Sequence, residues 1–167
     1  MDKSKTYKKA SSFALEHKFS LAMRLIDKYL FNFPDDTDLL ILKGNILDIQ
    51  LKHNKSIKLY KKVLSLNQNN IFALIDLGDA YRNKEQYKKA IKYYDMVITL
   101  IQDNDSLMTE STQDEYIDAC LGKVETLLLL NKPFKAIDCI NYAIKKCPTE
   151  SYRFSVFRKQ VIKQIKI

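Results

Sequence analysis

The feature that most constrains this chain is an internal repeat with a period of 34 residues. Gly44 and Gly78 stand 34 positions apart, and Tyr60 aligns in the same phase with Tyr94. A period of this length is typical of a small helical unit that cannot bury its apolar face alone and must stack on its neighbours. The phase predicts copies at residues 3–36, 37–70, 71–104 and 117–150, with about twelve extra residues before the last copy.

Each copy is predicted to contain two helices. In the third copy, apolar and small residues from Leu74 to Tyr81 recur at i, i+3, i+4 and i+7, which is the spacing of one helical face. A polar turn over residues 83–86 interrupts the pattern, and a second amphipathic stretch follows around Ala90. The small residue in the first helix, Gly78, allows a paired helix to approach closely.

The composition excludes several other fold classes. Three Gly and three Pro among 167 residues are too few for a β-sandwich, a barrel or a Gly-rich nucleotide loop. The longest apolar runs, such as residues 39–42, are far shorter than the roughly 20 residues of a membrane span. The first nine residues, MDKSKTYKK, contain no apolar signal segment, so we expect a cytoplasmic protein.

Helix-boundary signals agree with the repeat. Pro34 ends one copy, and Asp36 or Thr37 can cap the first helix of the next. The T-x-x-E sequence from Thr112 to Glu115 resembles a capping box and predicts an early start for the first helix of the fourth copy. We therefore predict a surface loop over residues 104–111.

These residues resemble the tetratricopeptide-repeat family over nearly the whole chain. The resemblance implies a single all-α domain over residues 1–167, a right-handed α-α superhelix of four helix-turn-helix repeats. The fourth copy departs from the family pattern because Val124 occupies the usual place of Gly, with Gly122 two positions earlier. The third copy carries the pattern most fully, in Leu74, Leu77, Gly78, Tyr81, Ala90, Tyr94 and Val97.

The last stretch, residues 151–167, is predicted to be a capping helix, because the family often ends with one extra helix that covers the exposed core. Its apolar groups are expected to share one broad face. They are Tyr152, Val156, Phe157, Val161 and Ile165.

No pattern in the chain indicates catalysis, a metal or a cofactor. Cys120, Cys139 and Cys147 are odd in number and lack the C-x-x-C spacing of zinc sites, so we expect reduced core residues. His17 and His53 are assigned to matching turns of the first two copies and are expected to be solvated. The sequence therefore predicts no enzyme, and no cofactor or metal ligand.

The family resemblance instead predicts a protein-interaction scaffold whose first helices line a concave groove. The groove composition suits a peptide or an amphipathic helix of a partner protein, apolar or basic in character. The residues predicted to line it are Tyr7, Ser11, Ile41, Asn45, Asp48, Phe72, Ile75, Asp79, Arg82, Leu121, Glu125 and Leu128.

One known activity of the family is excluded by residue. Members that bind the acidic tail of heat-shock chaperones use Lys, Asn and Arg side chains as a carboxylate clamp. The aligned positions here are Tyr7, Ser11, Leu42, Phe72 and Asp76, which provide no cation. We therefore expect no chaperone-tail clamp.

The charge distribution leaves two alternative functions open. The net charge is +8, but residues 103–118 contain six acids and no base, whereas residues 145–167 contain seven bases and one acid. The basic end could bind nucleic acid or an acidic surface, although only four of the 28 basic residues are Arg, so nucleic acid is disfavoured. The two stretches could also mediate head-to-tail self-assembly into a homo-oligomer, or screen each other within one chain.

Overall fold

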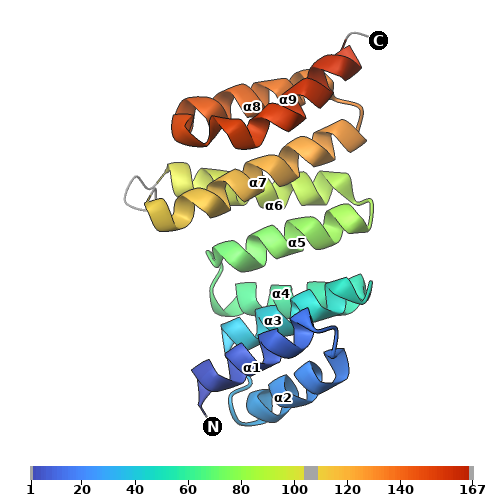
Figure 1. Cartoon of the computed structure of the whole chain (residues 1–167), viewed down its shortest axis with the longest axis vertical. Coiled ribbons are helices and arrows are strands. Elements are labelled where there is room, and N and C mark those ends of the chain that lie inside the picture. Colours follow the sequence, from blue (N-terminus) through green and yellow to red (C-terminus); the bar gives the residue numbers. More distant parts are fainter. Residues whose placement is uncertain (1, 104–108, 166–167) are drawn as a thin grey trace. The chain divides into compact units, whose positions relative to one another are not determined.

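The computed structural model describes residues 2–103 and 109–165, and every regular element within these residues is helical (Figure 1). The predicted all-α fold class is confirmed. A short 3₁₀ turn, Pro148–Glu150, precedes the last helix. The α-helices are α1 (Lys3–Leu15), α2 (Phe19–Asn32), α3 (Thr37–Ile49), α4 (His53–Leu66), α5 (Ile71–Asn83), α6 (Tyr87–Gln102), α7 (Glu110–Leu129), α8 (Pro133–Lys146) and α9 (Ser151–Ile165).

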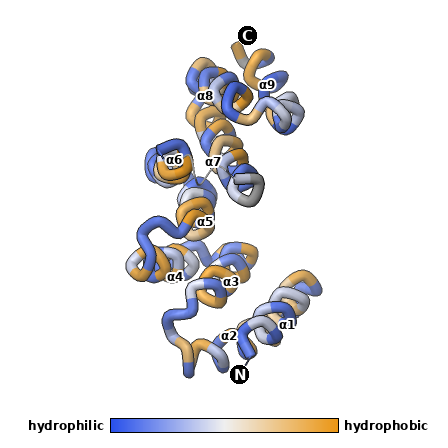
Figure 2. Tube along the Cα trace, turned by 90° about the vertical axis from the view of Figure 1, so that its left-hand side faces the viewer, coloured by the Kyte–Doolittle hydropathy of each residue, from blue (hydrophilic) through white to orange (hydrophobic). Residues whose placement is uncertain are grey.

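The helices belong to two compact units, which meet in the sequence within α5. The first unit extends to Asp76, and the second begins at Leu77. In the first unit α1 packs on α2, α3 packs on α4, and α2 contacts α3; in the second α6 packs on α7, α7 on α8, and α8 on α9. Hydrophobic and hydrophilic residues alternate along the helices, as expected when each helix buries one face (Figure 2).

The same turn joins the two helices of each copy. The residues His17, Leu51, Glu85 and Asn131 adopt left-handed backbone conformations, with φ between 53° and 59°. After α1, the His17 amide donates to the Ala14 carbonyl and the next amide to the Phe13 carbonyl, which is a Schellman motif. Three of the four turns therefore place an ordinary side chain where Gly is the unstrained residue.

The assignment of His53 to a turn that matches His17 is wrong. Leu51 holds the equivalent turn position, 34 residues after His17, and His53 is the first residue of α4. Its side chain is half-buried rather than solvated, because its Nδ1 atom lies 2.8 Å from Asp48 Oδ1.

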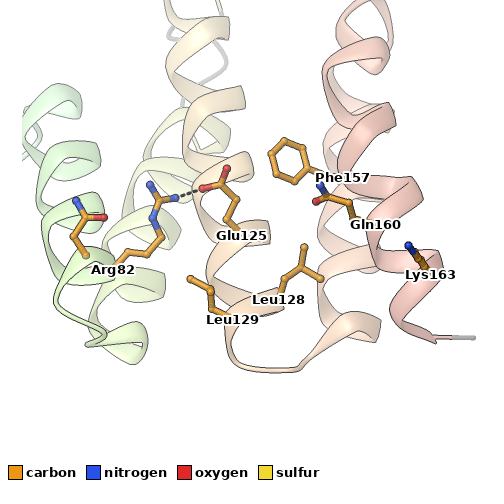
Figure 3. A pocket seen from close by; sticks show the side chains of 8 residues that line it. Arg82, Glu125, Leu128, Leu129, Phe157, Gln160 and Lys163 are labelled. Atoms are coloured by element: carbon orange, nitrogen blue, oxygen red, sulfur yellow. Dashed lines mark hydrogen bonds and ion pairs between the residues drawn. The ribbon is translucent and has the colours of Figure 1, made fainter. Parts of the chain in front are cut away.

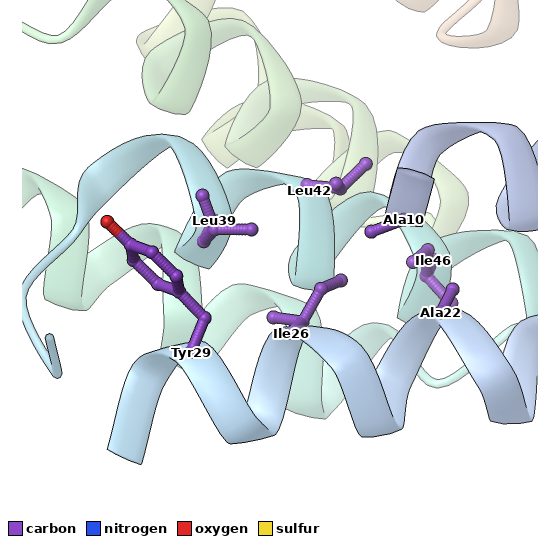
Figure 4. Packing of buried hydrophobic residues seen from close by; sticks show 7 residues of the cluster. All are labelled: Ala10, Ala22, Ile26, Tyr29, Leu39, Leu42 and Ile46. Carbon is purple, nitrogen blue, oxygen red and sulfur yellow. The ribbon is translucent and has the colours of Figure 1, made fainter. Parts of the chain in front are cut away.

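The core of the first unit forms where α1, α2 and α3 meet (Figure 4). Fully buried small residues, Ala10 and Ala22, let the helices approach, and Ile26 fills the space between them. Burial of an Ile or Leu side chain stabilises the fold by about 1.5–3 kcal/mol. The other members of the cluster are Tyr29, Leu39, Leu42 and Ile46.

Close helix pairing depends on matched residue sizes. A Cβ atom at Gly44 would lie 2.3 Å from the Tyr60 ring, and one at Gly78 would lie 2.6 Å from the Tyr94 ring. Each Gly therefore provides the space that the Tyr of the second helix occupies. These glycines are required by side-chain packing and not by backbone conformation, since no Gly in the chain has a positive φ.

The fourth copy has a different pair of residues at the positions of this Gly and Tyr. Val124 occupies the usual Gly position and is fully buried, and its counterpart in α8 is the smaller Ile140. Gly122 serves the preceding copy, because a Cβ atom there would lie 2.7 Å from the Tyr94 ring. Tyr94 therefore packs between two glycines, Gly78 in α5 and Gly122 in α7.

Two details of the second unit correct the sequence-based expectations. Helix α7 begins at Glu110, so Thr109 is the N-cap and its amide donates to Thr112 Oγ1 at 3.1 Å. Thr112 is consequently the third helical residue and not the cap, and the end of the predicted 104–111 loop is helical. Residues 104–108 lie outside the described part of the chain.

Helix α9 has apolar residues on two faces instead of the one predicted. Phe154 and Val161, spaced by two helical turns, are fully buried in the contact with α8 and α7, whereas Tyr152 and Val156 are exposed. Since apolar side chains occur all round this helix, periodicity in the sequence could not decide which face is buried.

Candidate functional site

The first unit contains a groove of about 610 Å³ between the first helices of successive copies. Tyr7 of α1 and Phe72 of α5 are large apolar side chains, yet they remain 41% and 58% exposed. Ile41 and Asn45 of α3 lie between them in the lining. The structure thus brings together four of the predicted residues. The remaining lining residues are Lys3, Ser4, Lys8, Asp38 and Asp76.

Four polar side chains at this groove, those of Lys3, Asp38, Asn45 and Asp76, are already engaged within the protein. The amide nitrogen of Asn45, turned toward the acceptors around it, donates to Asp76 Oδ2 at 2.9 Å and to the Ile41 carbonyl at 3.2 Å. The Lys3 ammonium lies 2.8 Å from Asp38 Oδ2, and this contact raises the Lys3 pKa. Apolar side chains are therefore the groups most available to a ligand here.

Asp48 was predicted to line the groove, but its carboxylate is an internal acceptor. It accepts hydrogen bonds from the Ser56 hydroxyl at 2.5 Å and the Tyr60 hydroxyl at 2.8 Å, and it contacts His53 at 2.8 Å. Ser, His and Asp are the residue types of a catalytic triad, but here Ser56 and His53 both contact the same Asp48 oxygen. A triad requires the His to accept the proton of the Ser. This cluster therefore joins α3 to α4.

The equivalent network in the second unit is ionic. The Tyr94 hydroxyl donates to Asp79 Oδ1 at 2.6 Å, and Asp79 aligns with Asn45 of the preceding copy. Arg82 Nη2 contacts Asp79 Oδ1 at 2.9 Å, and its Nη1 contacts Glu125. Burial, and secondarily the charge of Asp79, raises the Tyr94 pKa well above the usual range.

A second groove, of about 930 Å³, lies in the second unit (Figure 3). Leu128 of α7 and Phe157 of α9 lie on one side of the lining, and Leu129 lies toward the Arg82–Glu125 ion pair on the other. Arg82, Glu125 and Leu128 were predicted to line a groove, whereas α9 was predicted to be a cap or a basic binding surface, and its contribution to this groove was not predicted. Phe157, Gln160 and Lys163 recur every three residues along α9, and this spacing could have predicted that they share a face. The other lining residues are Asn83, Gln160 and Lys163.

The remaining predicted residues lie outside both grooves. Ser11, Ile75 and Leu121 are half-buried and line neither. None of the predicted residues is fully buried. Their role in binding a partner stays a prediction.

Part of the charge asymmetry is compensated within one chain. Arg153 of α9 contacts Asp114 at 2.5 Å and Asp118 at 2.8 Å, both on α7. Basic and acidic stretches that were considered as partners between chains are thus joined by ion pairs inside the second unit.

In the described residues, no group of three or more His, Cys, Asp or Glu side chains is arranged to hold a metal ion. None of the helices in residues 2–103 and 109–165 combines the length and the apolar content that crossing a membrane requires.

Sequence comparison identifies the repeat in the middle of the chain. Two family models, both described as tetratricopeptide repeat, match residues 37–70 and residues 59–92. No curated protein matches the chain in sequence.

Solved structures with a similar fold include MamA. A structure described as "Crystal structure of MamA" is 20% identical, with a TM-score of 0.67 over 99% of this chain and 92% of its own. Another, "MamA RS-1 ArsTM double mutant", is 16% identical, with a TM-score of 0.65 over 99% and 96%. "Structure of Naa15/Naa10 bound to HypK-THB" is 15% identical, with a TM-score of 0.52 over 86% of this chain and 25% of its own. At these identities the likeness shows the fold.

Proposed function

We propose that this chain is a protein-interaction scaffold of the tetratricopeptide-repeat family and that it binds a peptide or helix of a partner in the grooves between its first helices. The observation that carries the proposal is the groove of the first unit, where Tyr7 and Phe72 stay exposed beside Ile41. Exposed aromatic side chains clustered in a concavity are typical anchors of protein interfaces.

The partner is proposed to present large apolar side chains. Two acidic residues that were predicted to line the groove have internal partners: Asp48 binds Ser56 and Tyr60, and Asp79 binds Tyr94. Glu125 is paired with Arg82 in the second groove. Charge steering by these carboxylates is therefore weak, and apolar contact is the main source of affinity.

Neither groove supplies an arrangement for chemistry, and we propose that the chain has no enzymatic activity. Asn45 of α3 donates to Asp76 of α5, and Arg82 of α5 is paired with Glu125 of α7, so polar residues at each groove join neighbouring helices. Their arrangement fixes the first helices relative to each other within each unit, and this keeps the apolar anchors in place.

Photo-crosslinking from the groove tests this function. A benzophenone amino acid at position 72 is expected to crosslink a partner protein in a lysate of the source cells. The same amino acid at position 31 is the matched control, because Phe31 is 86% exposed on α2 and lines neither groove. Equal crosslinking from positions 31 and 72 would contradict the groove as the binding site.

Substitution of the second aromatic anchor provides an independent check. Tyr7→Ala is expected to weaken the captured partner's binding by about 1–2 kcal/mol, the usual loss for an interface aromatic residue. Tyr142→Ala removes a comparably exposed tyrosine from α8, outside both grooves, and should leave affinity unchanged. Isothermal titration with the identified partner segment measures both.

A further inference from the structure

A third pocket in the second unit, of about 460 Å³, shares no residue with the two grooves. It lies between α6, α7 and α8, with apolar residues in its lining and lysines from all three helices and the α7–α8 turn around it. One thiol, that of Cys139, opens into this pocket. The complete lining is Lys88, Ile91, Asp95, Lys123, Leu127, Leu130, Lys132, Lys135, Asp138 and Cys139.

A second thiol, that of Cys120, interacts with the first. Cys139 is half-buried on α8, and Cys120 is fully buried on α7, which packs against α8. The sulfur of Cys139 lies 4.0 Å from the carbonyl oxygen of Cys120. An accessible thiol next to a buried one is the arrangement of a reacting cysteine and its resolving partner.

The surroundings favour the thiolate form of Cys139 and not of Cys120. The neighbouring Cys120 thiol and the Lys123 ammonium lower the Cys139 pKa, whereas the contact with Cys139 and burial raise that of Cys120. Lys123 is fixed in place by Asp95, whose Oδ1 lies 2.6 Å from its Nζ. The pocket brings together four lysines and two aspartates, so its electrostatic field stabilises an anionic sulfur.

We propose that Cys139 is a peroxide-reactive thiol and that Cys120 resolves its oxidised form as an intramolecular disulfide. The pocket admits a hydroperoxide from solvent, and the close helix contact brings the second sulfur to the product. This site is separate from the proposed partner grooves and goes beyond the scaffold function.

The proposed reaction has two steps, oxidation of Cys139 and formation of the disulfide. The Cys139 thiolate attacks one oxygen of the hydroperoxide, the O–O bond breaks, and the leaving alkoxide or hydroxide takes up a proton. Cys139 becomes a sulfenic acid, S–OH, and is oxidised by two electrons. The Cys120 sulfur then attacks the Cys139 sulfur and the S–O bond breaks; the Cys120 proton and the hydroxide leave as water.

Cys147 provides an internal control. It is buried in the same unit, burial raises its pKa, and it lines none of the three pockets. If oxidation followed general opening of the second unit instead of access through the pocket, Cys147 would react alongside Cys139. A site-specific mechanism leaves Cys147 as the free thiol.

Mass spectrometry after treatment of the full chain with hydrogen peroxide tests the assignment. We expect a disulfide between the Cys120 and Cys139 peptides, with Cys147 alkylated as a thiol. In Cys120→Ser, the sulfenic acid should accumulate on Cys139 and be trapped by dimedone; in Cys147→Ser, the disulfide should form as in the wild type. Dimedone on Cys147, a Cys139–Cys147 disulfide, or no oxidation of Cys139 would overturn the proposal.

The role of the pocket is tested by the rate of disulfide formation in lysine variants that retain all three cysteines. In Lys123→Gln, the loss of a cation beside the thiol raises the Cys139 pKa and lowers the thiolate fraction, and the higher nucleophilicity of the less acidic thiolate offsets part of this loss. Disulfide formation in Lys123→Gln should therefore be about threefold slower than in the wild type. Lys146→Gln, which changes a lysine outside the pocket, should leave the rate unchanged. Equal rates in Lys123→Gln and Lys146→Gln would contradict activation by the pocket.

Discussion

The two units solve one structural problem with different chemistry. In the first unit, Tyr60 packs against Gly44 and donates to Asp48, which also accepts from the Ser56 hydroxyl and contacts the His53 imidazole. In the second unit, Tyr94 packs between Gly78 and Gly122 and donates to Asp79, whose charge is balanced by an Arg82 that also holds Glu125. The second and third copies share the aromatic residue and the glycine that makes space for it, whereas its polar partner differs between them.

The two units also contain equivalent ion pairs between consecutive copies. Lys43 of α3 contacts Asp27 of α2 at 2.6 Å, and Lys123 of α7 contacts Asp95 of α6 at the same distance. Each ion pair joins the first helix of one copy to the second helix of the copy before it. In the second unit this pair also orients the lysine that acts on Cys139, so a structural ion pair supplies a charge to the third pocket.

The largest expected effect comes from filling the space at a glycine. Gly44→Ala should destabilise the fold by about 2 kcal/mol, because the added Cβ would lie 2.3 Å from the Tyr60 ring and overpacking exceeds the gain in helix propensity. Urea denaturation followed by circular dichroism measures the change.

The matched double variant makes this prediction specific. Gly44→Ala with Tyr60→Ile reproduces the Ala10–Ile26 pair of the first copy. The combined loss should be smaller than the sum of the single losses by at least about 1 kcal/mol, the coupling typical of residues in contact. Strict additivity would show that the ring does not determine the need for glycine.

A smaller effect distinguishes the two polar networks by their response to salt. Arg82→Gln should destabilise the second unit by about 1 kcal/mol at low ionic strength, because Asp79 and Glu125 lose their common cation. The loss should shrink markedly at 1 M salt, since charges are screened within about 3 Å there. Unfolding free energies at the two salt concentrations measure the difference.

Tyr60→Phe is the comparison for that experiment in the first unit. It removes a neutral hydroxyl donor and should lower stability by about 1 kcal/mol at either salt concentration. Amide hydrogen exchange then localises each loss to its unit. A Tyr60→Phe effect as salt-dependent as that of Arg82→Gln would contradict the distinction between the networks.

The smallest effect is a gain in stability at the turns. Leu51→Gly should stabilise the protein by about 0.5 kcal/mol, because Leu51 has a φ of 59° and is 78% exposed, so Gly relieves backbone strain with little loss of packing. Asn131→Gly should gain less, since Asn tolerates the left-handed conformation. Thermal denaturation of both variants gives the ranking, and a loss of stability in Leu51→Gly would show that the turn is not strained.

Much of the fold could be read from the sequence because the repeat imposes it locally. The helical spacing, the Gly–Tyr matches and the polar turns all follow from contacts within about one period, so Gly78 and Tyr94 were identified together. The candidate site was predicted less completely. Tyr7, Ile41, Asn45 and Phe72 line one groove, but Asp48 and Asp79 bind internal partners, a difference that depends on side-chain geometry.

What the sequence alone determined was the all-α repeat, because periodic apolar spacing and residue size act through neighbouring helices of the same few copies. The tertiary structure decided which face of α9 is buried, that Gly122 serves the preceding copy's tyrosine, and that Cys139 faces both a pocket and Cys120. These features depend on how residues of different helices meet in space. Spacing along one helix shows which residues share a face, but it does not show what that face contacts.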